Sequence, residues 1–170
     1  MENKQEYVAF ISYRHKAMDQ QIAKKVHTML ERYHVPKELQ GDGIGPRLGR
    51  VFRDEEELPV SSDLTSSIQM ALDHSQFLLV VCTPDTLESV WVEQEIKYFV
   101  KRHGREHLIA ILVNGTPDES FPVPLTTDFV EDGKTVIRMT EPLAANLTDI
   151  NHRYDSRRLQ KEMIRIYAAI

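Results

Sequence analysis

The sequence contains a single cysteine and no hydrophobic stretch long enough to cross a membrane. Cys82 has no second cysteine to pair with inside the chain, which excludes a disulfide-stabilised secreted scaffold. The polar segment 1–6 leads into an apolar run of only strand length, so neither a signal peptide nor a spanning helix is predicted. We therefore expect a cytoplasmic protein.

The sequence also lacks the basic stripe of a nucleic-acid-binding protein. Its formal net charge is −5, and residues 51–95 hold ten acidic side chains against a single basic one. This segment would repel a phosphate backbone, and no run of lysines and arginines interleaved with aromatics lies elsewhere. Nucleic acid is not an expected partner.

Signatures of metal and phosphate-loop sites are missing as well. The seven histidines and one cysteine form no set with metal-ligand spacing, and the acidic run 54–57 lacks the alternating ligands and turn glycine of a calcium loop. The glycines of 41–45 follow loop sequence and lack the lysine–serine pair of a phosphate-binding loop. We expect no metal and no resident cofactor, a flexible turn at 41–45, and a buried structural thiol at Cys82.

What the sequence does contain is the composition of one globular domain. Hydrophobic residues make up 41% and charged residues 28% of a 170-residue chain, which is long enough to bury a core. We expect a single domain over 1–170. The last helical pattern stops without a cap, so we also expect the domain to be excised from a longer multidomain protein whose other part acts as a sensor.

Apolar runs and helical periodicities alternate along the chain. Strands are predicted at 7–12, 50–53, 77–82 and 107–113, with an edge strand at 134–138. Helices are predicted at 18–33, after a cap at Ser61 or Ser62, from Pro84 to Gly104, and at 155–170, with loops at 34–49 and 114–132. This alternation predicts a parallel sheet with helices on both faces.

Polar side chains follow the predicted strands, where parallel sheets bind their ligands. Ser12, Tyr13, Arg14 and His15 follow the first strand, and the second leads through Arg53 into the acidic run. Arg14 there fits a phosphate or acidic partner; the alternative is a loop arginine that pairs with the acidic segment 51–95. For most acids of the run 54–57 we expect a solvated, mobile loop.

Trp91 and Glu95 lie four residues apart in the third predicted helix. That spacing places an indole and a carboxylate on one helical face, where they could flank one ligand. The alternative is that Trp91 belongs to the core and Glu95 is a solvated surface acid.

Together, three segments resemble the bacterial branch of the Toll/interleukin-1 receptor (TIR) domain family. They are Phe10-Ile-Ser-Tyr-Arg14, Val51-Phe-Arg-Asp54 with the loop through Leu64, and Ser89-Val-Trp-Val-Glu-Gln-Glu95. The resemblance runs from about residue 7 to 113. It implies an α/β, flavodoxin-like three-layer sandwich with a central five-stranded parallel sheet in the order 2-1-3-4-5.

The resemblance also implies cleavage of NAD+, as substrate, at the nicotinamide–ribosyl bond, giving ADP-ribose or a cyclic isomer. Glu95 matches the family's catalytic glutamate. The residues that the resemblance assigns to NAD+ binding are Trp91, Ser12, Tyr13, Arg14, Phe52, Arg53 and Glu57. The departing nicotinamide is neutral, so a lone carboxylate that stabilises the oxocarbenium-like state suffices.

Two departures and one alternative accompany this resemblance. The loop 58–63 lacks a glycine that relatives often carry, and a long connector, 34–49, separates the first helix from the second strand. Family members commonly complete the active site by homotypic self-association, so we expect activation by assembly and a role in bacterial defence. The alternative function is a non-catalytic TIR signalling adaptor.

Overall fold

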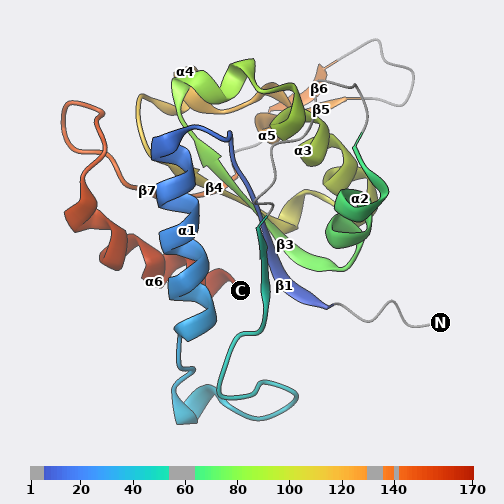
Figure 1. The fold of residues 1–170 in the computed structure, drawn as a ribbon, viewed down its shortest axis with the longest axis vertical. Helices are drawn as coiled ribbons and strands as arrows, with labels where there is room; N and C mark the ends of the chain where they lie inside the picture. The colour runs from blue at the N-terminus through green and yellow to red at the C-terminus, as the bar shows by residue number, and fades with distance from the viewer. Residues whose placement is uncertain (1–5, 54–63, 130–135, 140–141) are drawn as a thin grey trace.

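The computed structural model describes residues 6–53, 64–129, 136–139 and 142–170, with backbone only for 128–129 and 136–139 (Figure 1). Its centre is a five-stranded sheet in which every neighbouring pair is parallel. The strands are β1 (Tyr7–Ser12), β2 (Val51–Arg53), β3 (Ser75–Cys82), β4 (Leu108–Leu112) and β7 (Leu143–Asn146), in the order β2-β1-β3-β4-β7. This order confirms the flavodoxin-like fold.

Helices cover both faces of this sheet and complete the three layers. Helices α1 (Ala17–Arg32) and α6 (Leu159–Ala169) lie on one face, and α2 (Ser66–Asp73) and α3 (Val90–His103) lie on the other (Figure 1). In the described ranges, no helix combines the length and the apolar character that a membrane span needs.

The central strand β3 divides the hydrophobic core into two clusters. Phe77, Leu79 and Val81 pack in the cluster beneath α1 and α6, whereas the alternate residues Leu78, Val80 and Cys82 pack in the cluster beneath α2 and α3. A strand buried on both faces must be apolar at every position, which explains the unbroken hydrophobic run. Cys82 is fully buried, and burial raises the pKa of its thiol, so the predicted structural thiol is confirmed.

The predicted fifth strand was placed wrongly. Residues Val136–Met139 form β6, which pairs antiparallel with β5 (Thr127–Phe129) in a separate two-stranded sheet. The edge strand next to β4 in the main sheet is β7, with the sequence Leu-Ala-Ala-Asn. Alanine and asparagine have low strand propensity, so β7 is formed by its pairing with β4 and not by a local preference.

Four other predicted elements differ from the structure. Helix α2 begins at Ser66 with Thr65 as its cap, and the predicted caps Ser61 and Ser62 lie outside the described residues. The stretch from Pro84 divides into a 3-10 turn, η2 (Pro84–Glu88), and α3. The predicted loop after β4 contains α4 (Pro117–Ser120), α5 (Val123–Thr126) and β5, and the last predicted helix begins with η4 (Ser156–Arg158).

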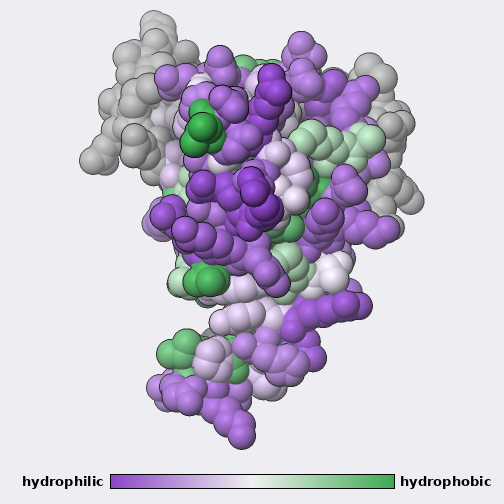
Figure 2. Space-filling model, turned by 90° about the vertical axis from the view of Figure 1, so that its left-hand side faces the viewer, coloured by the Kyte–Doolittle hydropathy of each residue, from purple (hydrophilic) through white to green (hydrophobic). Residues whose placement is uncertain are grey.

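The connector 34–49 extends from the body of the molecule and contains the 3-10 turn η1 (Lys37–Leu39) (Figures 1 and 2). Gly41 and Ile44 exchange two backbone hydrogen bonds of 2.9 and 2.8 Å. Between them, Asp42 and Gly43 both have positive φ, at 49° and 91°, which is the backbone that an Asp-Gly hairpin turn requires. The predicted turn at 41–45 is therefore a hairpin turn.

Candidate functional site

The carboxyl ends of β1 and β3 meet at the point where the strand order reverses. The chain leaves β1 toward α1 on one face of the sheet and leaves β3 toward α3 on the other. Open α/β sheets bind their ligands at this position. Arg14 joins the two loops: its Nη1 donates a 3.0 Å hydrogen bond to the carbonyl oxygen of Asp85 and lies 3.6 Å from Oδ2 of the same residue.

Glu95 lies on helix α3, which follows the carboxyl end of β3 after the turn η2. The N-cap of α3, Ser89, accepts a 3.3 Å hydrogen bond from the backbone N–H of Val92, and the apolar face of the helix packs on the sheet through Val92, Ile96 and Phe99. Glu95 follows the same side of the helix and is only 6% exposed. The alternative of a solvated surface acid at this position is therefore wrong. Trp91, one turn earlier, is only partly buried.

Phe52 and Ser12 lie on the same face of the sheet as α3. The Phe52 ring stacks on Phe10 with centroids 5.0 Å apart, and both rings belong to the cluster beneath α2 and α3. Ser12 is paired in register with Val80, a member of that cluster, and is 1% exposed. Since residues paired in register point to one face, Ser12 points toward the α3 side.

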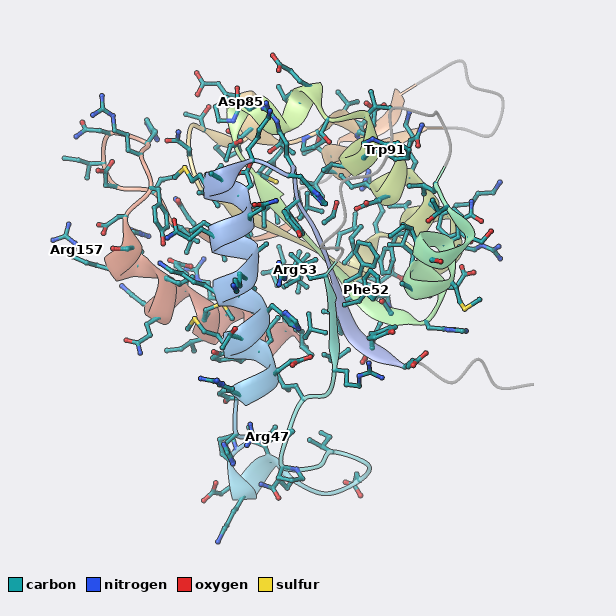
Figure 3. All side chains as sticks on the ribbon, in the orientation of Figure 1. Arg47, Phe52, Arg53, Asp85, Trp91 and Arg157 are labelled. Carbon is teal, nitrogen blue, oxygen red and sulfur yellow. The ribbon has the colours of Figure 1, made fainter. Side chains whose placement is uncertain are left out.

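Tyr13 and Arg53 lie on the opposite face. Tyr13 is buried in the cluster beneath α1 and stacks on His15 with ring centroids 4.7 Å apart. The Nε atom of Arg53 is 3.5 Å from Nδ1 of His27 on α1. Tyr13 and Arg53 also line a shallow depression together with α1 residues. Figure 3 shows Phe52 and Arg53 pointing to opposite sides of their strand.

The residues predicted for the site therefore lie on two different faces of the sheet. The face that carries Glu95 and Trp91 also carries Ser12 and Phe52, and Arg14 lies at the edge between the faces. The remaining predicted residue, Glu57, lies outside the described residues.

One charged residue at this edge was missed by the sequence analysis. Asp19, in the first turn of α1, is 3% exposed. Burial raises its pKa to about 6, with the positive charge of Arg14 acting in the opposite direction and the negative charge of Asp85 in the same one. The signal was present, because Asp19 precedes Ile22, Ala23 and Val26 with the spacing of the buried helical face.

The α3 side of the sheet carries a buried carboxylate, Glu95, and two partly buried aromatic side chains, Phe52 and Trp91, while the cation Arg14 lies at the carboxyl edge between the faces. A carboxylate in a low-dielectric setting stabilises positive charge that develops beside it, and flat rings hold a flat heterocycle. Within the part of the chain that the structure describes, no three histidine, cysteine or acidic side chains gather as metal ligands. The arrangement suits a cationic transition state on a ligand that also carries an anionic group.

Comparison with known proteins supplies a family. The TIR domain family model matches residues 9–146. The chain is 38% identical over 113 residues to the NAD(+) hydrolase ApTIR of Actinoplanes sp., an alignment that covers 64% of this chain and 14% of that protein. Among solved structures, it resembles the TIR domains of the activated Roq1 resistosome that recognises the effector XopQ, with a TM-score of 0.49, 20% identity, and coverage of 66% of this chain and 60% of the other.

Proposed function

The chain belongs to the TIR domain family, and on that premise we propose that it cleaves NAD+ between nicotinamide and ribose. The products are nicotinamide and ADP-ribose or a cyclic isomer of ADP-ribose. The observation that carries the proposal is the burial of Glu95 on the sheet face that also holds Phe52 and Trp91. The alignment with a curated NAD(+) hydrolase supports the same substrate.

In the proposed reaction the bond between ribose C1′ and the nicotinamide nitrogen breaks, and its electron pair leaves with nicotinamide. The pyridinium becomes a neutral pyridine, so the leaving group needs no proton from the protein. The Glu95 carboxylate stabilises the positive charge that develops on the ribose and orients its hydroxyl groups. Water then adds at C1′ and loses a proton, giving ADP-ribose, or a nucleophile within the ADP-ribose itself attacks C1′ and closes the cyclic product.

The neighbouring side chains take binding roles in this proposal. Trp91 packs against the nicotinamide or its ribose, and Phe52 forms the wall on the β2 side. Ser12 lines the base of the site, and the guanidinium of Arg14 binds the diphosphate, for which its planar donors are suited. Tyr13 and Arg53 lie on the other face, so we assign neither a direct contact with NAD+.

Regulation belongs to the proposal as well. We propose that self-association raises activity, and that the domain works in a longer protein whose sensor part clusters it during bacterial defence. The competing function is a signalling adaptor without catalysis. The one-turn spacing of Trp91 and Glu95 on α3 favours the enzyme, because an adaptor has no need of an indole and a carboxylate in that arrangement.

Turnover of NAD+ by the purified chain, fused to a clustering tag and kept at high concentration, tests the proposal. We expect release of nicotinamide, with the second product identified by chromatography, and loss of release in Glu95→Ala. Clustered wild-type protein that leaves NAD+ intact would favour the adaptor. If unclustered protein releases nicotinamide at the same rate as clustered protein, activation by self-association is contradicted, but the proposed cleavage of NAD+ is not.

A further inference from the structure

Arg14 contacts both the backbone carbonyl and the side-chain carboxylate of Asp85. The side chain of Asp85 is 73% exposed and that of Arg14 is 21% exposed, so the ion pair lies at the surface of the edge. The 3.0 Å bond goes to the backbone carbonyl of Asp85, whereas the carboxylate lies farther away, at 3.6 Å. The carbonyl contact is therefore the tighter of the two, and the carboxylate is free to turn into solvent.

The backbone of Asp85 is fixed by the turn that contains it. In η2, the side chain of Thr86 accepts a 2.8 Å hydrogen bond from the N–H of Thr83, and Thr86 itself is 1% exposed. This reciprocal cap keeps the Asp85 carbonyl in place while leaving its side chain outside. Exposed ion pairs of this kind are weak, so the carboxylate contact exchanges readily.

Asp19 lies near this ion pair, buried on α1. Its carboxyl is buried in the first turn of α1, and the charges of both Arg14 and Asp85 act on it. The edge thus holds one guanidinium, one exposed carboxylate that contacts it and one buried carboxylate that feels the charge of both. Two carboxylates against one guanidinium leave net negative charge at the edge, which opposes an incoming diphosphate.

We propose that Asp85 is an internal competitor for the anionic part of the substrate and thereby sets its affinity. The Asp85 carboxylate holds Arg14 in the free protein and gives up Arg14 to the diphosphate of NAD+. The Asp85 carbonyl keeps the guanidinium at the edge during this exchange. The inference rests on the proposed function, because it takes the diphosphate of NAD+ as the ligand of Arg14.

The substitution Asp85→Asn removes the competing charge and keeps the backbone carbonyl that Arg14 uses. An exposed pair of this strength predicts that the Kd for NAD+ and for inorganic pyrophosphate falls about two- to fivefold. The matched control is Glu88→Gln, which removes the same charge from an exposed position in the same η2 turn. We expect the control to leave both Kd values within about 1.5-fold, because screening weakens charges that are not in contact.

Calorimetric titration of the full chain with NAD+ and with inorganic pyrophosphate tests the inference, in a Glu95→Gln background that stops turnover. Tighter binding in Asp85→Asn and not in Glu88→Gln supports it. Equal Kd values in Asp85→Asn and its parent, or equal gains in both variants, would overturn it. NAD+ turnover is measured separately, in protein that keeps Glu95. If this protein turns over NAD+ normally while Asp85→Asn leaves the Kd unchanged, only the exchange at Arg14 is refuted. If it neither turns over nor binds NAD+, both proposals are refuted.

Discussion

The ring of Phe52 stacks on the ring of Phe10, with centroids 5.0 Å apart and planes inclined by 26°. This contact spans the β1–β2 pair and holds Phe52 on the α3 side of the sheet, the side that carries Glu95. The next residue, Arg53, consequently points to α1. Neighbouring residues of one short strand therefore belong to different surfaces, and only one of them is available to the proposed site.

This division predicts different effects of two adjacent alanine substitutions. Phe52→Ala removes the wall of the site, so kcat/KM for NAD+ should fall about tenfold or more, with a loss of about 1–3 kcal/mol in the free energy of unfolding because the ring is only partly buried. Arg53→Ala should leave kcat/KM within about twofold. Steady-state nicotinamide release measures both, and a larger loss in Arg53→Ala than in Phe52→Ala would contradict the assignment.

Trp91 should act in binding and contribute little to stability, because its side chain is only partly buried. Trp91→Ala should raise KM for NAD+ by about three- to tenfold, the worth of one aromatic contact, while Trp91→Phe should restore most of the affinity. Kinetics at several NAD+ concentrations separate KM from kcat. A Trp91→Ala protein that unfolds far more easily while keeping its KM would show that the indole belongs to the core.

Asp19 should make stability fall as pH rises. Its pKa is raised by burial from 3.8 to about 6, so between these values the folded state holds a proton that the unfolded chain has lost. The stabilising contribution is complete below pH 3.8 and is lost as pH rises through 6. Relative to Asp19→Asn, the wild-type free energy of unfolding should fall by about 2 kcal/mol between pH 4 and pH 7. Urea unfolding of both proteins across this range measures it, and parallel pH profiles would contradict it.

Arg105 should stabilise the segment after β4. Its guanidinium donates to the carbonyl oxygens of Leu125, Pro124 and Thr127 at 3.1, 2.7 and 2.6 Å. Arg105→Ala leaves these buried carbonyls without that donor, and should cost about 2–3 kcal/mol of unfolding free energy. Arg102→Ala, which removes an exposed arginine next to Asp73, should cost less than about 1 kcal/mol. Equal costs in denaturant unfolding would show that Arg105 contributes no more than a surface charge.

Much of the fold follows from local sequence patterns. The run at 77–82 is hydrophobic throughout because β3 is buried on both faces, and that alone marks the central strand. Residues 143–146 carry no comparable signal, because their strand conformation depends on pairing with β4, which is distant in sequence. The edge strand was predicted at 134–138 because this segment contains β-branched residues. Residues 136–139 do form a strand, but it belongs to the small second sheet.

The candidate site was predictable in its residues and less so in its geometry. The one-turn spacing of Trp91 and Glu95 could be read from the sequence, whereas the burial of Glu95 depends on how α3 docks on the sheet. The separation of Tyr13 and Arg53 from Glu95 depends on strand register, which a short segment does not specify by itself. The pairing of Arg14 with Asp85 corresponds to the alternative stated for Arg14, a loop arginine paired with the acidic segment 51–95. Because 71 residues separate the two side chains, the sequence does not indicate which acid of that segment it is.

The most direct test of the account is the initial rate of nicotinamide release from NAD+ by clustered wild-type, Glu95→Gln and Glu93→Gln proteins at equal concentration. Glutamine keeps the shape of the side chain and removes only its charge, and Glu93 is a nearby α3 acid that is 43% exposed and paired with Lys97. We predict that Glu95→Gln loses at least about a hundredfold in kcat, the scale expected for a lost electrostatic contact in the transition state, and that Glu93→Gln stays within about twofold. A Glu95→Gln protein that releases nicotinamide at the wild-type rate would contradict the account.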